Sequence, residues 1–242
     1  MLMEGSSLGR LDPYECFPAE EDVEERLLGA MREAPGLVLV AASAQNVDRV
    51  VSIHRAAKRS GRRLVMDLQA AEVLEATGYR SIPSPLFPDV HLYLPWRQAR
   101  WVKRHGAFDL IGGVRKARRL FPEDIAVRPG RYVVLLNRTF TEDRRFASLI
   151  AGARAVWSQW EGYLRLGAHG ERLASDLAPH GVALEVIHTS GHADPPSLRR
   201  LVAAVRPETL SPVHTFHPER FEGLFGDLAP VVLRGDGVPW TV

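Results

Sequence analysis

The clearest hydrophobic pattern in the chain lies between residues 37 and 67. The run "LVLVAAS" has the length and apolar character of a strand, and "RRLVMDL" has the pattern of a second one. Between them, one helical stripe carries Val47, Val50, Val51, Ile53 and Ala57, and Gly61 supplies a C-terminal stop. A strand, a helix and a strand in this order predict a parallel crossover.

The alternation of strand-like and helix-like patterns continues along the chain. Further strands are predicted at 131–137, 153–158, 182–188 and 209–214. Helices are predicted at 69–78, 171–181 and 195–205, with a short one from Pro218. Four prolines between residues 80 and 96 favour a loop or an edge strand there. The order as a whole predicts an α/β protein with a mainly parallel sheet, and a closing hairpin around 235–237.

Three histidines fall within the predicted crossover of residues 182–213. His188 ends its first strand, Ser190 and His192 lie in the following turn, and His214 ends its second strand. Open α/β sheets bind ligands at the carboxyl ends of their strands. Asp194 and Pro195 suit the start of a helix, where an anion is favoured. The pattern therefore predicts that His192 and His214 lie close together around an anionic ligand.

A structural role for each histidine is the alternative. A single histidine at a strand end is often a hydrogen-bonded packing residue, and for His188 both interpretations stay open. The four-residue spacing of His188 and His192 would suit a metal on a helix, but Gly191 and two prolines place them in a turn. The other histidines are interpreted as surface or packing residues: His54, His91, His105, His169, His180 and His217.

Composition and charge narrow the class of protein. The 242 residues are 45% apolar and carry a net charge of only +2, which is ordinary for a soluble globular protein. The single cysteine excludes an internal disulfide, and no apolar run could span a bilayer, so we expect a cytoplasmic protein without a membrane partner. Residues 97–119 hold eight basic side chains against one acid, with two tryptophans beside them, which suits either a solvated surface or a nucleic-acid groove.

Several motifs resemble the β-CASP-type metallo-β-lactamase-fold hydrolases, a group that includes ribonuclease J and the mRNA cleavage and polyadenylation nucleases. "HTSGHA" followed by "PVH" is similar to the C-terminal end of such enzymes. "SAQNVDRVVSIHRAAKRSGRRLVMD" and "WSQWEGYL" are similar to segments of their inserted domain, and "LMEGSSLGR" to the strand that ends in a carboxylate. The resemblance covers nearly the entire chain.

The resemblance implies a role for five residues. Glu4 would orient His192, which would protonate the leaving oxygen or contact the scissile phosphate, and His214 would be a late zinc ligand. Ser190 and His188 would contact the substrate phosphate. The implied reaction is zinc-dependent hydrolysis of a phosphodiester, with RNA as the implied substrate. An acid–base histidine beside a metal-activated water is coherent chemistry for such a reaction.

The chain departs from the family pattern in one large respect. The family's H-x-H-x-D-H cluster precedes the carboxylate, but here Glu4 is the fourth residue. We therefore expect an incomplete zinc site, and a truncated, split or degenerate protein that is inactive alone or depends on a partner chain supplying the missing half. The expected domains are a lactamase remnant at 1–19, a β-CASP-like α/β domain at 20–160 and the C-terminal part of the lactamase αββα fold at 161–242.

Two other functions remain open at the sequence level. The chain could bind nucleic acid or a partner subunit without cleaving, having kept the basic surface and lost the metal. It could also be a metallo-hydrolase of the same fold that acts on a small phosphoester or ester. No residue read directly from the sequence distinguishes RNA from DNA.

Overall fold

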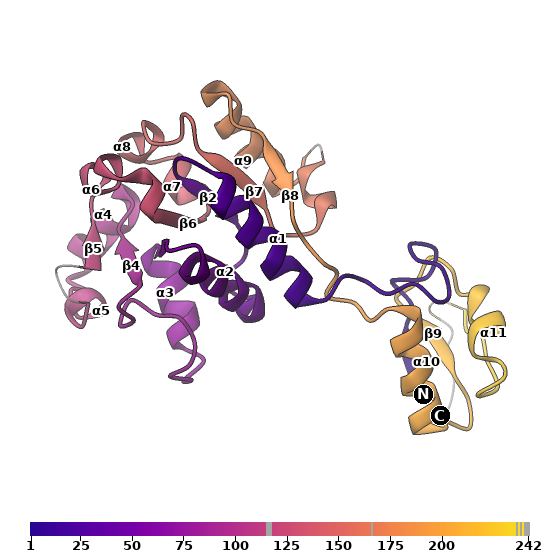
Figure 1. The fold of residues 1–242 in the computed structure, drawn as a ribbon. Helices are drawn as coiled ribbons and strands as arrows, with labels where there is room; N and C mark the ends of the chain where they lie inside the picture. Colours follow the sequence, from indigo (N-terminus) through magenta and orange to yellow (C-terminus); the bar gives the residue numbers. More distant parts are fainter. Residues whose placement is uncertain (115–117, 166, 236, 238, 240–242) are drawn as a thin grey trace. The chain divides into compact units, whose positions relative to one another are not determined.

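The chain forms two compact units in a computed structural model that describes residues 1–114, 118–165, 167–235, 237 and 239. The larger unit comprises Ala19–Thr189. The smaller unit joins Met1–Pro18 to Ser190–Val242, so it is built from both ends of the chain. Figure 1 follows the chain through both units.

A seven-stranded parallel sheet forms the centre of the larger unit (Figure 1). Its order is β5-β4-β3-β6-β2-β7-β8. The strands are β2 (Val38–Ala41), β3 (Arg63–Met66), β4 (Val90–Tyr93), β5 (Arg119–Leu120), β6 (Tyr132–Leu136), β7 (Arg154–Trp157) and β8 (Leu184–Val186). All the pairings between these strands are parallel. This arrangement confirms the predicted α/β class with a mainly parallel sheet.

The central strands are apolar because both faces of the sheet are covered. In β2, Val38 and Val40 belong to one buried cluster, whereas Leu39 and Ala41 belong to the cluster on the opposite face. Successive side chains of a strand point to opposite faces, so a strand buried on both sides becomes a continuous hydrophobic run. The sequence "LVLVA" therefore suits an interior position in such a sheet.

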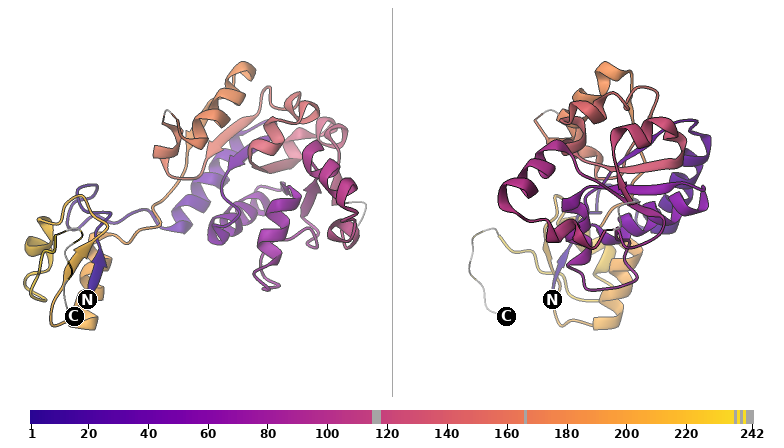
Figure 2. Two further views of the ribbon diagram at one scale, coloured as in Figure 1. Left: turned by 180° about the vertical axis from the view of Figure 1, so that it is seen from behind. Right: turned by 90° about the vertical axis from the view of Figure 1, so that its left-hand side faces the viewer.

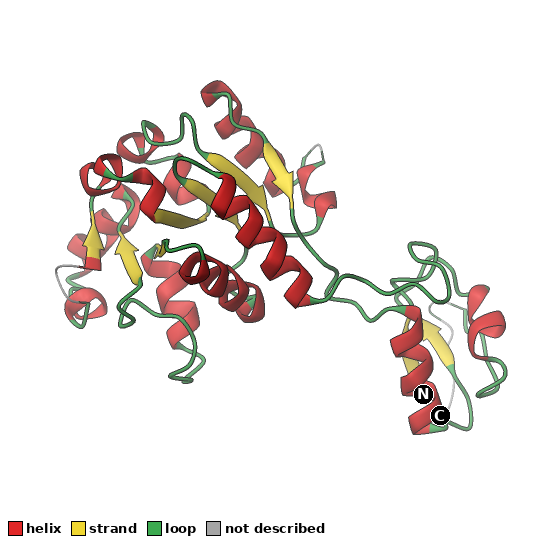
Figure 3. Ribbon diagram, viewed as in Figure 1, coloured by secondary structure: helices red, strands yellow, loops and turns green. Residues whose placement is uncertain are grey.

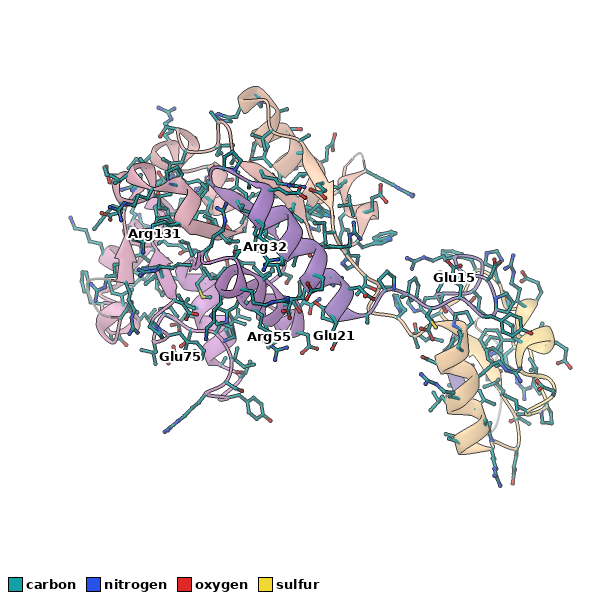
Figure 4. The ribbon with its side chains drawn as sticks, viewed as in Figure 1. Glu15, Glu21, Arg32, Arg55, Glu75 and Arg131 are labelled. Atoms are coloured by element: carbon teal, nitrogen blue, oxygen red, sulfur yellow. The ribbon has the colours of Figure 1, made fainter. Side chains whose placement is uncertain are left out.

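Helices cover the two faces of this sheet, as Figure 3 shows. The first cluster takes side chains from α1 (Glu20–Glu33), α2 (Val47–Arg59), α3 (Leu68–Glu75), α4 (Trp96–His105) and α5 (Asp109–Gly112). The second takes side chains from α6 (Pro122–Val127), α7 (Arg138–Thr141), α8 (Arg144–Ala147) and α9 (His169–Leu177). Helices α1 and α2 lie side by side in Figures 1 and 2, and charged residues on them such as Glu21 and Arg55, labelled in Figure 4, are exposed.

Local side-chain hydrogen bonds mark the starts of α2 and α3, and Gly61 ends α2 as predicted. The side chains of Asn46 and Asp67 accept hydrogen bonds from the backbone N–H groups of Arg49 and Ala70, and so begin α2 and α3. Gly61 follows α2 with a φ of 75°, a left-handed conformation that glycine adopts at little cost. The predicted strand–helix–strand elements of residues 37–67 are thus confirmed, although β2 and β3 flank β6 and do not pair directly.

The proline-rich stretch of residues 80–96 corrects one prediction. Residues 80–89 form a loop, as predicted, but residues 90–93 form β4, which lies between β3 and β5 inside the sheet and so is not an edge strand. Pro88 and Pro95 lie outside the strand at its two ends. Proline lacks an N–H donor only at its own position, so flanking prolines leave the ladder of β4 intact.

The smaller unit contains a two-stranded parallel sheet of β1 (Leu2–Glu4) and β9 (Ser211–Val213). Helices α10 (Pro195–Val205) and α11 (Arg220–Phe225) complete the unit, which Figure 2 shows from two further directions. Its buried core is small and consists of Met3, Leu8, Leu198, Val202, Leu210, Phe221, Phe225 and Ala229. Among the described residues, no helix of either unit is long and apolar enough to cross a membrane.

The predicted crossover of residues 182–213 is wrong. Strand β8 pairs with β7 in the larger unit, whereas β9 pairs with β1 in the smaller unit. The two strands therefore belong to different sheets, and His188 and His214 do not end neighbouring strands. Residues 161–189 belong to the larger unit. We had expected them to be part of the lactamase segment 161–242.

Two predictions fall partly outside the described residues. Val231 forms a parallel bridge with Leu210, but residues 236, 238 and 240–242 of the expected closing hairpin are not described. Arg115 and Lys116 of the basic run also lie outside the described part of the chain.

Candidate active site

The smaller unit brings Glu4, His192 and His214 together. Glu4 is the last residue of β1 and pairs with Val213, so His214 leaves β9 at the same edge of the two-stranded sheet. His192 lies in the turn before α10, which packs on this sheet through Leu198 and Val202. Residues near the two ends of the chain thus meet because β1 and β9 are hydrogen-bonded neighbours.

The three side chains are within bonding reach of one another. Nδ1 of His192 lies 2.7 Å from Oε2 of Glu4, and Nδ1 of His214 lies 3.7 Å from the same oxygen. The centroids of the two imidazole rings are 5.5 Å apart. One donor atom from each residue lies within 4.8 Å of the others. The predicted proximity of His192 and His214 is therefore present in the structure.

Ser6 is a fourth member of the cluster, which the sequence analysis missed. Its hydroxyl donates to Oε2 of Glu4 at 2.9 Å and lies 3.0 Å from Nδ1 of His214. It is also 3.1 Å from the backbone carbonyl of His214. The available signal was the spacing: Ser6 is two residues beyond Glu4, and alternate residues of an extended chain point to the same side.

The carboxylate of Glu4 is held in its ionised form. Partial burial on its own would raise its pKa, but hydrogen bonds from Ser6 and His192 and the charge of a protonated His192 outweigh that effect. The backbone N–H of Ala193 also donates to it. The pKa of Glu4 is consequently lower than its ordinary value, because each of these contacts favours the charged form.

The charge of Glu4 fixes how His192 is protonated. An ionised carboxylate can only accept a hydrogen bond, so Nδ1 of His192 carries the proton that lies between them. Its other nitrogen, Nε2, is then the atom that can gain or release a proton. The His192 side chain is 40% exposed, which leaves the ring accessible to a ligand.

The turn before α10 differs in one respect from the prediction. We expected its backbone N–H groups to favour an external anion, but the N–H of Ala193 interacts with Glu4, an anion of the chain itself. Ser190 accepts a hydrogen bond from the backbone N–H of His192 at 3.2 Å and so shapes the turn. Asp194 begins α10 by accepting from Ser197 at 2.8 Å, as predicted.

His214 has an unusual backbone conformation. Its φ is +50°, in the left-handed region that side-chain-bearing residues rarely adopt. Such a conformation costs of order 1 kcal/mol, and it is often found at functional sites. Here it accompanies the short contact between His214 and Ser6, and 72% of the side chain stays exposed.

His188 belongs to the larger unit, whereas Glu4, His192 and His214 belong to the smaller one. Nδ1 of His188 is 3.0 Å from Nη1 of Arg49, and because a guanidinium only donates, this ring nitrogen is an acceptor. Arg49 is 1% exposed and pairs with Glu20 at 2.6 Å, and it also donates to the hydroxyl of Ser158 at 2.8 Å. The structure thus gives His188 a partner in the packing of its own unit.

The residue types in the cluster are ones that bind zinc. Imidazole nitrogen and carboxylate oxygen are both zinc ligands, and a zinc site holds four ligands, one of which is water when the site is catalytic. In this chain Oε2 of Glu4 already accepts from Ser6 and His192, whereas the ring of His214 is largely exposed. His214 is therefore the residue best placed to act as a ligand, and the described residues of this unit supply too few others for a complete site.

Helix α4 presents a basic and aromatic surface in the larger unit. Trp101 is 48% exposed and its ring stacks on His105, with centroids 4.7 Å apart. Trp96 is also exposed, beside the guanidinium of Arg97. The helix contains no acidic residue, and it exposes three further cations, Arg100, Lys103 and Arg104. Exposed aromatic rings among cations are typical of surfaces that bind single-stranded nucleic acid.

Comparison with known families gives one partial match. Residues 181–218 match the model of the Zn-dependent metallo-hydrolase RNA specificity domain, RMMBL. This stretch contains His188, Ser190, His192 and His214. The match supports membership of the metallo-β-lactamase superfamily. No curated protein is similar enough to the chain to count as a match.

Comparison with solved structures concerns the fold. A crystal structure described as a protein of unknown function from Enterococcus faecalis V583 is similar to the chain, with a TM-score of 0.65 and 21% identity. The similarity covers 98% of this chain and 50% of that one. The chain thus spans about half the length of this structure.

Proposed function

We propose that the chain is part of a zinc-dependent phosphodiesterase of the β-CASP group that acts on RNA. The observation that carries this proposal is the 2.7 Å contact of His192 with Glu4, beside His214. The family match supports a metallo-hydrolase context and an RNA-specificity role for residues 181–218. The remainder of the proposal rests on what this cluster can do chemically.

His192 is the proposed general acid. Glu4 holds the proton on Nδ1, so Nε2 of a protonated ring can donate to the leaving oxygen of a phosphodiester. Ionised Glu4 also stabilises the positive charge of that ring. An imidazole exchanges a proton near neutral pH, which suits it to this step.

His214 is the proposed zinc ligand of this chain. A bound zinc ion would supply Lewis acidity toward a phosphoryl oxygen and an ionised water near neutral pH. The remaining ligands would come from elsewhere, and a partner chain is one proposed source. Exposed apolar side chains on the smaller unit, Leu2, Leu201, Val205, Val213 and Phe216, suit burial against such a partner.

The RNA-binding surface of the larger unit is proposed to be α4. The phosphate contacts implied for His188 and Ser190 are proposed separately, each within its own unit. Trp96 and Trp101 would stack on bases, while the cations of the helix follow the phosphates. Binding should therefore weaken steeply as the salt concentration rises. The aromatic contacts would favour unpaired strands, whose bases are free to stack.

The test is cleavage of single-stranded RNA by the chain purified from its own cells with any bound partner. We expect activity that a chelator abolishes and zinc restores. His192→Ala should reduce kcat by about 10²-fold or more, whereas the matched control His180→Ala, a half-buried histidine of the larger unit, should not. Activity that survives both zinc removal and His192→Ala would contradict the mechanism.

A second candidate is a binding module that holds RNA without cleaving it. The incomplete set of ligands in the smaller unit favours it. In that case the purified chain would bind RNA through α4 with no zinc and no cleavage. Stoichiometric zinc in the purified protein would exclude this candidate.

A further inference from the structure

A pocket of about 490 Å³ opens at the amino-terminal edge of the seven-stranded sheet. It is lined where β3, β4, β5 and β6 begin, by Arg63, His91, Arg119 and Tyr132, and by residues of α6 and its two ends, including Phe121, Asp124 and Arg128. His188 follows β8 and lies at the opposite, carboxyl edge. None of the residues that line the pocket is used in the proposed function.

The charge of this lining is positive. Three arginines and one carboxylate, Asp124, line it, and Asp124 caps α6 by accepting from the N–H of Phe121. The guanidinium of Arg119 donates to the backbone carbonyls of Ile111 and Val114, so Arg63 and Arg128 are the candidate cations for a ligand. His91 adds no charge at neutral pH, because burial, and then the positive charge of Arg63, lower its pKa to about 4. Nη1 of Arg63 lies 3.3 Å from Nε2 of His91, so the ring accepts from the guanidinium and holds it at the pocket wall.

The lining of the pocket also contains apolar side chains. Phe121 is 61% exposed and Val127 is 77% exposed, so their side chains stand open to solvent beside the arginines. The buried ring of Tyr132 packs edge-on against His91, with centroids 5.9 Å apart. A ligand that satisfies this lining has an anionic group for the arginines and a flat apolar group for Phe121.

We propose that this pocket binds the phosphate and base of a nucleotide, either free or as part of a nucleic-acid strand. The volume lies within the range of small-molecule sites, about 300–1,000 Å³. Arginine is suited to phosphate because its planar guanidinium donates two parallel hydrogen bonds. Figure 4 shows that Arg131, a further cation, lies on the side of the larger unit where β6 begins.

Calorimetric titration of the full chain with AMP, with inorganic phosphate and with a short single-stranded RNA tests the proposal. Arg128 is exposed, so Arg128→Glu should leave the fold intact and weaken AMP and phosphate binding about tenfold or more. Phe121→Ala should weaken AMP binding about fivefold and leave phosphate binding unchanged, because only the base contact is lost. Arg144→Glu, an exposed arginine outside the pocket, is the matched control.

The outcomes separate the sources of the ligand. In Arg128→Glu, loss of AMP and phosphate binding with RNA binding unchanged identifies a free nucleotide, and loss of RNA binding together with AMP binding identifies a strand. Equal losses in Arg128→Glu and Arg144→Glu, or no saturable binding of AMP, phosphate or RNA, would overturn the proposal. His192→Ala should bind AMP as the parent chain does, so a failure of this site is distinguishable from a failure of the proposed catalysis.

Discussion

The two units of the chain differ in how much of their stability they can supply themselves. The larger unit buries a complete parallel sheet under helices on both faces, with large buried side chains such as Trp157, Phe140 and Phe146. The described residues of the smaller unit form two strands and a core of eight buried hydrophobic residues, yet they include Glu4, His192 and His214. The candidate chemistry is thus concentrated in the less self-sufficient part of the molecule, which is why a partner is central to the proposed function.

The sharpest test of this comparison is to replace one buried phenylalanine by alanine in the core of each unit. Phe146→Ala should destabilise the larger unit by about 3–5 kcal/mol, because Phe146 is fully buried against Tyr93 and Phe140. Phe225→Ala should unfold the smaller unit alone. Hydrogen exchange followed by mass spectrometry reports each unit separately, and Phe216→Ala, at a 98% exposed position, is the control. Simultaneous loss of protection in both units after Phe225→Ala would contradict the comparison.

The next largest effect is expected from the buried Arg49. Arg49→Met removes its pair with Glu20 and its contacts with Ser158 and His188, and should cost about 2–4 kcal/mol. Arg59→Met is a matched control on the same helix, because its pairs with α1 are exposed, and it should cost less than about 1 kcal/mol. Urea unfolding measures both variants. Equal losses of unfolding free energy in the two variants would mean that the burial of Arg49 does not strengthen its ion pair.

A smaller effect is expected at the start of α10. Asp194→Ala removes the acceptor for the N–H of Ser197 and should destabilise the smaller unit by about 1 kcal/mol. Asp194→Asn keeps an acceptor in the same place and should retain most of that stability. Exchange rates of the peptides that cover α10 measure the difference, and identical rates in the two variants would show that the cap is not required.

The smallest effect concerns Glu4 and pH. Its pKa is lowered in the folded state, so it stabilises the smaller unit above its unfolded pKa, and this contribution is lost as the pH falls through the lowered value. Since the side chain is 32% exposed, the contribution should be below about 1 kcal/mol. Glu4→Gln should therefore reduce stability at pH 7 but not in strong acid, as measured by exchange in α10. A loss of equal size at both pH values would contradict the ionised pair.

The sequence by itself determined most of the larger unit. Its strands and helices follow from local patterns. A continuous apolar run indicates a strand that is covered on both faces, and a stripe of apolar side chains indicates α2. Asn46 and Gly61 mark the two ends of that helix. Local patterns do not encode strand order. The placement of β6 between β3 and β2, and of β4 inside the sheet, depends on contacts between distant segments.

Only the tertiary structure decided which residues form the candidate site. The sequence placed His188, His192 and His214 in one crossover, but hydrogen bonding assigns β8 to the sheet of the larger unit and β9 to β1. The pairing of β1 with β9 brings Glu4 and Ser6 to His192 and His214, across nearly the full length of the chain. Periodicity reports which face of an element is buried, whereas the identity of its neighbour is a property of the folded chain.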